Sequence, residues 1–343
     1  MYTGGKFLNV LAVDIGVGTQ DVLFSLEETD ENSPRMVLPS PTRQKSQEIE
    51  KTSGDLFIRG STMGGGPVSS AIERRAQSSS VVMTPRAART VRDDLSEVEE
   101  KGIEIDNEGP EGASEIVLGD LDFPALELLL DETSASCDCL AVAVQDHGDA
   151  PQGVSDRRFR VSRMAEVIES GGELSEFALL ETSEDFHRFS AVLKEGRQLS
   201  ENVVVTDTKI SAMTGAHSGS PSLIVDAGNG HVSGALFSED TRITAFFEHH
   251  TASLDSDHLT DILKSFLSGE LTNDRIFEEG GHGAYIDKIL EPEDFLATGP
   301  RRAMVIGTNL PFRSPPNLEN AMMAGPYGLV RLTEELFEDM EAN

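Results

Sequence analysis

One pattern occurs twice in this sequence and limits what the chain can fold into. An apolar run, an Asp-x-Gly-x-Gly turn and a second apolar run follow one another in residues 8–26 and again in residues 222–238. Two apolar runs joined by a tight glycine-containing turn predict a pair of antiparallel strands. We therefore expect two equivalent strand-turn-strand units, one in each half of the chain, facing a single cleft.

The two turns are also candidates for chemistry. Their glycines allow backbone N–H groups to approach a phosphate, and an Asp at the end of the first strand can hold magnesium through water. Asp and Gly are favoured in any turn, so a single copy would more often be structural. Because the pattern occurs twice after apolar strands, we expect a phosphate clamp in which Asp14 and Asp226 hold the metal.

The paired turns resemble the phosphate motifs of the actin, Hsp70 and sugar-kinase superfamily. This resemblance implies an α/β fold of two ribonuclease-H-like (actin-like ATPase) domains with a ligand cleft between them, and ATP with magnesium as the ligands. The matching residues of the first motif are Asp14, Gly16, Gly18, Thr19 and Gln20, and those of the second are Asp226, Gly228, Asn229, Gly230 and His231. His231 stands where a small hydroxyl residue is common, and Gly307 in Val305-Ile-Gly-Thr-Asn309 stands for the adenosine motif.

A glycine-rich segment is a second candidate for anion binding. Gly64, Gly65 and Gly66 follow a predicted strand and precede a predicted helix. A flexible backbone at a helix N-terminus can hold an anion, and a tight crossover would need the same small residues. Both interpretations remain open.

Asp146 and His147 are the candidate catalytic residues. They follow the apolar run 140–144, and open α/β sheets bind ligands at the ends of their strands. Asp146 could accept a proton from a substrate hydroxyl while His147 orients or donates, as phosphoryl transfer requires. The alternative is a polar loop with a surface histidine.

A further group of residues resembles metal ligands in composition only. It consists of His249, His250, Asp255, Asp257 and His258. Their spacing matches no standard zinc motif, so loop and helix-cap roles are favoured.

Three segments resemble a narrower family. Residues 60–67, 144–148 and 226–231 look like an archaeal and bacterial family that carries domain of unknown function 1786 and is often labelled a pyruvate formate-lyase activating protein. Radical-SAM activation needs three cysteines to hold an iron–sulfur cluster, and this chain has only Cys137 and Cys139. We therefore expect no iron–sulfur cluster, no radical-SAM activase and no disulfide between thiols at strand spacing.

The charge of the chain excludes some partners. Lys and Arg total 28 while Asp and Glu total 60, which gives a formal net charge of −32. Double-stranded nucleic acid and anionic membranes need a basic face, so neither is an expected partner. The acidic residues recur along the chain, which suggests a salty cytoplasm or a codon bias, with an ordinary acidic surface as the alternative. No signal peptide or membrane span is recognisable, and two free thiols favour a reducing cytoplasm.

The predicted elements divide the chain into two domains. Strands and helices alternate, which favours α/β structure. The stretch 214–221 is predicted to be a hinge, so the domains are 1–213, with insertions, and 214–343. Apolar spacing predicts a helix over 85–101, and the run 303–306 predicts a strand.

Three functions are compatible with these patterns. The favoured one is binding of a nucleotide with magnesium, with phosphate transfer or hydrolysis as the associated activity. The second is a non-enzymatic module that senses a ligand or assembles with a protein partner on the same fold. The third is an enzyme whose glycine-rich loops hold a non-nucleotide phosphate.

Overall fold

The computed structural model describes residues 8–26, 32–151, 153–318 and 320–342. The first sheet has six strands in the order β3-β2-β1-β8-β10-β9. These strands span Arg35–Pro39 (β3), Thr19–Ser25 (β2), Val10–Ile15 (β1), Cys139–Val144 (β8), Val203–Asp207 (β10) and Ala178–Leu179 (β9). β1 pairs antiparallel with β2 and parallel with β8, which in turn pairs parallel with β10.

The second sheet repeats this arrangement in the order β14-β13-β12-β11-β15. Its strands span Gly283–Ile286 (β14), Ile243–His250 (β13), His231–Phe237 (β12), Ser222–Ala227 (β11) and Asp294–Thr298 (β15). β11 pairs antiparallel with β12 and parallel with β15, as β1 does with β2 and β8. Asp14 and Asp226 are each the penultimate residue of the equivalent strand, so the predicted equivalence of the two units is confirmed.

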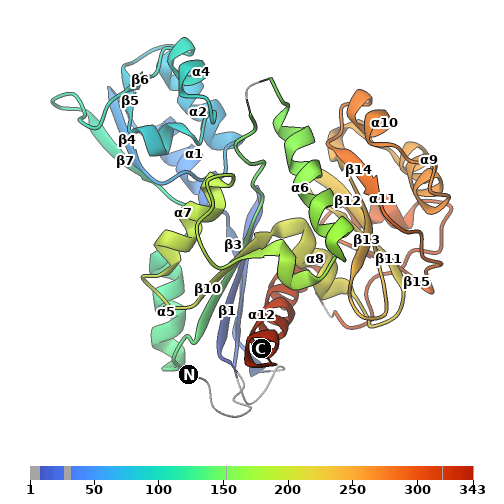
Figure 1. Ribbon diagram of the computed structural model, residues 1–343. Coiled ribbons are helices and arrows are strands. Elements are labelled where there is room, and N and C mark those ends of the chain that lie inside the picture. Colours follow the sequence, from blue (N-terminus) through green and yellow to red (C-terminus); the bar gives the residue numbers. More distant parts are fainter. Residues whose placement is uncertain (1–7, 27–31, 152, 319, 343) are drawn as a thin grey trace.

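A smaller sheet is inserted after β3. Its four strands are all parallel, in the order β6-β5-β4-β7. They span Glu104–Ile105 (β6), Val81–Met83 (β5), Leu56–Gly60 (β4) and Ser114–Leu118 (β7), and the helices packed with them are α1 (Pro41–Lys51), α2 (Pro67–Ala76), α3 (Pro85–Ala88) and α4 (Leu95–Glu100). Figure 1 shows this inserted subdomain at one end of the molecule, opposite α12.

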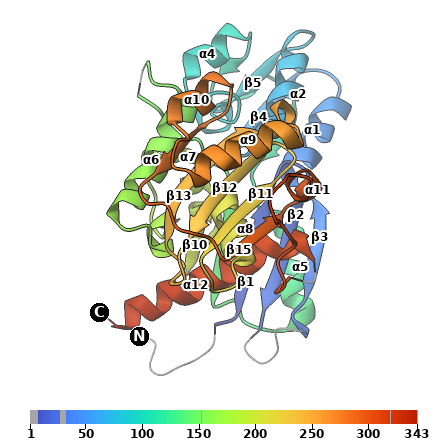
Figure 2. The same cartoon turned by 90° about the vertical axis from the view of Figure 1, so that its right-hand side faces the viewer.

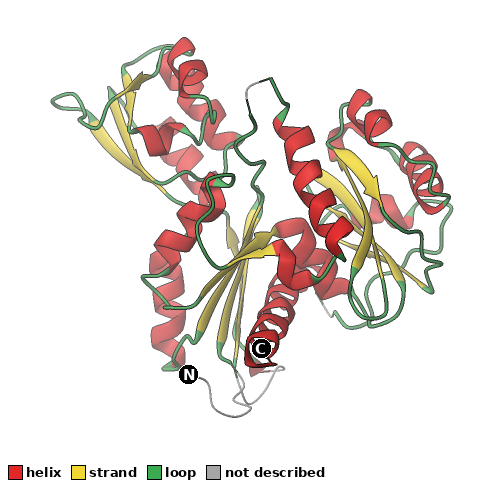
Figure 3. Cartoon of the chain, in the orientation of Figure 1, coloured by secondary structure: helices red, strands yellow, loops and turns green. Residues whose placement is uncertain are grey.

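Helices form alternating layers with the two main sheets (Figure 3), and Figure 2 looks onto the helices that cover the second sheet. α5 (Phe123–Thr133) and α7 (His187–Gly196) pack on one face of the first sheet, and α9 (Ser256–Leu267), α10 (Asn273–Glu278) and α11 (Arg302–Ile306) pack on the outer face of the second. One apolar core joins the inner faces of both sheets to α8 (Thr208–Ala216) and α12 (Ala324–Ala342). α6 (Asp156–Ser170) also reaches the second sheet at β13 and β14.

The central helices α8 and α12 cross at two glycines. A Cβ atom on Gly215 would lie 1.9 Å from the carbonyl oxygen of Ala324, and one on Gly328 would lie 1.8 Å from that of Ser211. Only glycine lets the two backbones approach this closely. The crossing therefore holds the two sheets together through small residues.

The chain thus has an α/β fold of two ribonuclease-H-like domains, in each of which an antiparallel set of strands continues into parallel pairing. Among the described residues, no helix combines the length and apolar character that crossing a bilayer requires.

Two predicted elements are wrong, and a third segment differs in part from the prediction. The helix expected over 85–101 is divided into α3 and α4, because Asp94 accepts a hydrogen bond from the backbone of Ser96 and starts a new helix. The strand expected at 303–306 is α11, since a four-residue apolar run cannot distinguish helix from strand. Residues 214–216 of the expected hinge belong to α8, whose residues 209–216 are all buried and so show no amphipathic pattern.

Candidate functional site

A cavity of about 660 Å³ lies where the two domains and the inserted subdomain meet. Both Asp-x-Gly-x-Gly turns line it, together with the glycine-rich loop before α2 and the residues that follow β8. The predicted site residues at this cavity are Asp14, Gly16, Gly18, Thr19, Gly64, Gly65, Gly66, Asp146, His147, Asp226, Gly228, Asn229, Gly230 and His231. Segments that are far apart in the sequence therefore meet at one place.

The two hairpin turns have the same local geometry and approach each other. The backbone N–H of Gly16 donates to the carbonyl of Thr19 at 2.9 Å, and that of Gly228 donates to the carbonyl of His231 at 2.9 Å. A Cβ atom on Gly18 would lie 3.4 Å from Nδ2 of Asn229 on the other turn. The turns thus form two sides of one narrow cleft.

Asp14 is a buried carboxyl at the base of the first hairpin. Burial is the main reason its pKa is raised to about 8; a hydrogen bond from Thr208 opposes the shift, and nearby Asp21 and Asp226 add to it. Thr208 Oγ1 donates to Asp14 Oδ1 at 2.6 Å. Burial also raises the pKa of Asp21, its cross-strand neighbour, to about 7. A cation in the cleft would favour the ionised forms of these carboxyls.

Asp226 in the second hairpin is paired with a buried lysine that the sequence patterns did not indicate. Lys209 Nζ lies 2.5 Å from Asp226 Oδ2 and 3.1 Å from the carbonyl oxygen of His231. Burial disfavours the charge of Lys209, but Asp226 outweighs this and raises the lysine pKa. Lys209 is the second residue of α8, and the Asp207 side chain caps the helix by accepting from the Lys209 backbone N–H at 2.8 Å.

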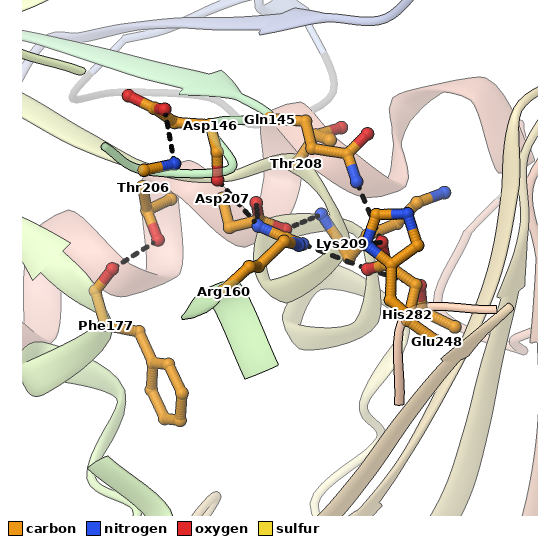
Figure 4. A network of polar contacts seen from close by, with 12 residues as sticks. Gln145, Asp146, Arg160, Phe177, Thr206, Asp207, Thr208, Lys209, Glu248 and His282 are labelled. Carbon is orange, nitrogen blue, oxygen red and sulfur yellow. Dashed lines mark hydrogen bonds and ion pairs between the residues drawn. The ribbon is translucent and has the colours of Figure 1, made fainter. Parts of the chain in front are cut away.

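A network of buried charges links the two domains beside the cavity (Figure 4). Arg160 Nη1 donates to Asp207 Oδ2 at 2.7 Å, and its Nη2 donates to Glu248 Oε2 at 3.0 Å. Gln145 Nε2 donates to the other oxygen of Glu248 at 2.9 Å. Burial opposes ionisation of Glu248, but Arg160 outweighs it and holds the glutamate pKa well below its usual range. These partners lie on β10, α6, β13 and the end of β8, so sequence proximity gave no indication of the network.

Asp146 lines the cavity, but its carboxylate is already well satisfied. Oδ2 accepts from the backbone N–H groups of Arg188 and Phe189 at 2.9 and 3.0 Å, and Oδ1 accepts from that of Gly148 at 3.0 Å. These contacts anchor the start of α7. The geometry thus suits a structural anchor better than a proton acceptor, and the catalytic role of Asp146 stays a prediction.

The glycine-rich loop is held by side chains of its surroundings. The N–H of Gly64 donates to Asp120 Oδ1 at 3.2 Å, and Arg188 forms a double hydrogen bond with the same carboxylate, at 2.7 and 2.8 Å. Gly66 has φ +56° and precedes Pro67, the first residue of α2, with no side chain capping the helix. Crossover and anion-binding roles are both compatible with this loop.

Two predicted site residues are not brought to the cavity. Gln20 is fully buried and donates to Asp122 Oδ2 at 3.1 Å, on the opposite face of β2 from Thr19 and Asp21. Gly307 ends α11 and does not line the cavity. Gly299, which directly follows β15, lines it instead, and a Cβ there would lie 2.5 Å from Asp226 Oδ1. A glycine directly after a late strand is the sequence signal that could have identified Gly299. The late strand was predicted at 303–306, however, and not at Asp294–Thr298.

The predicted histidine and aspartate group does not form one site. Asp255 caps α9, accepting from the backbone N–H of His258 at 2.8 Å, while Asp257 is exposed in its first turn. His258 Nε2 lies 2.9 Å from Glu279, whereas buried His249 Nε2 lies 3.9 Å from the same carboxylate. Asp255 therefore has the helix-cap role that the sequence analysis favoured for this group.

The two cysteines are free thiols on and beside β8. Burial raises the pKa of the Cys137 thiol to about 11 and also raises that of Cys139. Both thus favour the protonated form, which is a poor metal ligand.

Three solved structures are similar to the chain over nearly its whole length. MreB5 of Spiroplasma citri bound to ADP has 10% identity and a TM-score of 0.39, covering 99% of this chain and 100% of that chain. The apo pSK41 ParM protein has 11% identity and a TM-score of 0.34, covering 98% and 99%. The activator of the 2-hydroxyisocaproyl-CoA dehydratase from Clostridium difficile, with bound ADPNP, has 9% identity and a TM-score of 0.33, covering 97% and 97%.

These scores are low, and the fold assignment above rests on the strand order and pairing of the two sheets. A search of the curated proteins found no match. The family model described as "Putative pyruvate format-lyase activating enzyme (DUF1786)" matches residues 63–304, which is more than half of the 343 residues. The chain therefore belongs to the DUF1786 family.

Proposed function

We propose that the cavity binds the phosphate groups of a nucleotide, with ATP as the favoured ligand and magnesium as the cation. The observation that carries this proposal is the meeting of two equivalent turns, each with an Asp at its base, across a single cavity. The volume of about 660 Å³ lies within the usual range of small-molecule sites.

The charges around the cavity support a metal-bound phosphate. In their ionised forms, Asp14, Asp21 and Asp226 would repel a bare polyphosphate in a partly desolvated cleft, and a cation between them and the ligand would favour those ionised forms. Asp14 offers a carboxylate without a basic partner in direct contact, and we assign it the main magnesium contact. Lys209, paired with Asp226, supplies a positive charge beside the second turn.

The inserted subdomain gives the cavity a further wall. Gly64, Gly65 and Gly66 face the same space as the hairpins. In a phosphotransferase this wall would hold the acceptor or a non-nucleotide phosphate.

A specific observation favours a second function, a module that binds nucleotide without turning it over. The three backbone donors on Asp146 leave this predicted base little freedom to accept a proton. Measuring phosphate release from ATP distinguishes the two functions, because a binding module would bind ATP without releasing phosphate.

The family description names an activating enzyme, and we propose no radical chemistry for this chain. An iron–sulfur cluster needs thiolate ligands, whereas Cys137 and Cys139 are only two and have raised thiol pKa values.

Calorimetric titration of ATP tests the proposal. We expect wild-type protein to bind ATP more tightly with magnesium than with a chelator, and Asp14→Asn to weaken the magnesium-dependent binding about tenfold or more, because the carboxylate charge is lost. Asp257→Asn, at an exposed position outside the cavity, is the matched control and should bind as wild type. Absence of ATP binding by the wild type, or equal magnesium dependence in Asp14→Asn, would refute the proposal.

A further inference from the structure

Four of the chain's eight histidines gather at one edge of the cavity. His147 follows β8 in the first domain, whereas His231 opens β12, His250 ends β13 and His282 precedes β14 in the second. The ring centroids of His147 and His282 lie 5.2 Å apart, and those of His231 and His282 lie 4.7 Å apart. Separate segments of both domains thus bring their imidazoles together.

Three of these rings have the geometry of a metal site. One nitrogen from each of His147, His231 and His282 lies within 4.8 Å of the others. A tetrahedral zinc ion with Zn–N distances of about 2.0–2.1 Å would hold its nitrogens roughly 3.4 Å apart. Small rotations of the three rings would bring their nitrogens to this spacing. His250 packs against two of the rings but does not belong to this group.

The ring nitrogens of this group have no hydrogen-bond partner among the described residues, and only one of them lies within ion-pair distance of a charged side chain there. Among the described residues, no hydrogen bond reaches a ring nitrogen of His147, His231 or His282. His282 is only 1% exposed, and its buried Nδ1 lies 3.1 Å from Glu248 Oε1 without the alignment of a hydrogen bond. A buried polar atom without a partner is costly, and a metal ion would satisfy this group.

The protonation state and the surrounding charges suit a cation. Burial lowers the pKa of all three imidazoles, to about 3 for His231 and about 2 for His282, so they are neutral and offer lone pairs. Such low values oppose a cluster held together by histidine protonation.

The two buried ion-paired groups beside the rings, Asp207–Arg160–Glu248 and Lys209–Asp226, together carry an excess of one negative charge. Three buried carboxylates, Asp207, Asp226 and Glu248, are paired with two buried cations, Arg160 and Lys209. A divalent ion would offset this excess. Glu248 also lies where a carboxylate orients a ligating imidazole in many metal sites.

We propose that His147, His231 and His282 bind one zinc ion that bridges the two domains. Imidazole nitrogens suit zinc, and three protein ligands leave a fourth position open. His147 and His231 line the cavity, so the open position faces it and can take water or a ligand atom. The ligands of this site do not include Asp14, to which the magnesium contact is assigned, and the zinc proposal does not rest on the nucleotide proposal.

Zinc titration without nucleotide or magnesium tests this site. Chelator-treated wild-type protein should bind one zinc ion per chain, and the cobalt-substituted protein should show the visible absorption of a tetrahedral site. His147→Ala and His282→Ala should each lower zinc affinity at least about tenfold and abolish the cobalt spectrum. His147 is only half-buried, so its variant keeps the test usable if His282→Ala fails to fold.

His258→Gln is the matched control, because His258 lies in the other histidine pair, beside Glu279. It should bind zinc as wild type. No stoichiometric zinc in the wild type, unchanged affinity in folded His147→Ala, or loss of zinc in His258→Gln would each overturn the proposal. The ATP titration is run separately, so failure of one site leaves the other measurable.

Discussion

At the scale of single residues, the site depends on carboxyls that the fold has removed from water. Asp14 is 9% exposed, and Gly325 at the start of α12 packs so closely that a Cβ there would lie 2.0 Å from Asp14 Oδ2. Folding therefore disfavours the ionised form of Asp14, as its pKa of about 8 indicates. A buried carboxyl held in this way is costly for the empty protein and is suited to a cation.

This burial predicts an unusual pH dependence of stability. Between pH 4 and pH 8 the folded chain keeps a proton on Asp14 that the unfolded chain has released, so the free energy of unfolding of the wild type falls as pH rises. Asp14→Asn removes this contribution. The contributions of Asp21 and of Asp93, whose pKa burial also raises to about 7, remain. We expect the variant to gain stability relative to the wild type between pH 5 and pH 8, by at most about 4 kcal/mol.

Urea unfolding of both proteins at pH 5 and pH 8, without divalent cations, measures this difference. Adding magnesium at pH 8 should stabilise the wild type more than the variant. Parallel stability curves for the two proteins would show that Asp14 titrates normally and would remove the electrostatic argument for a cation there.

At the scale of elements, the crossing of α8 and α12 positions both hairpins. α8 begins with Thr208, which contacts Asp14, and Lys209, which contacts Asp226. The same helix meets α12 at Gly215 and Gly328. Any displacement of α8 would thus move the partners of both aspartates together.

We predict that Gly328→Ala destabilises the protein by about 1–3 kcal/mol, because the added methyl group would overlap the Ser211 carbonyl and force the helices apart. Gly230→Ala is the control, since no atom lies within 4 Å of its Cβ position. Thermal and urea unfolding measure both variants. Equal stability of the two variants would mean that the crossing tolerates expansion.

The extent of successful prediction also differs between elements. The two hairpins were predictable, because their apolar runs and glycine turns are local features repeated in each half of the chain. α8 was not, since a helix buried on all sides has no polar face to reveal its period. Because Lys209 lies on this helix, the sequence patterns did not indicate its role either.

Sequence patterns could not predict contacts between residues that lie far apart in the chain, for a different reason. Arg160 and Glu248 are 88 residues apart, and His282 joins His147 and His231 only through the folding of both domains. A single sequence carries no spacing signal for such contacts. The histidine pattern near residues 249–258 was visible, whereas the geometric cluster draws on other segments.

At the scale of the whole molecule, the two domains are arranged as the sides of a clamp. Equivalent turns from the two sheets face one cavity, and buried contacts across the domains hold them in register. A phosphate chain bound there would contact both turns at once. Binding through one turn only would leave the duplication of the pattern without a functional explanation.

Hydrogen–deuterium exchange of the full chain tests this central claim most directly. With ATP and magnesium together, we predict slower exchange in both hairpins, residues 14–20 and 226–231, compared with ATP and chelator or magnesium alone, because ligand contacts to both turns suppress local opening. Protection of only one hairpin, or of neither, under saturating ATP and magnesium would contradict the clamp.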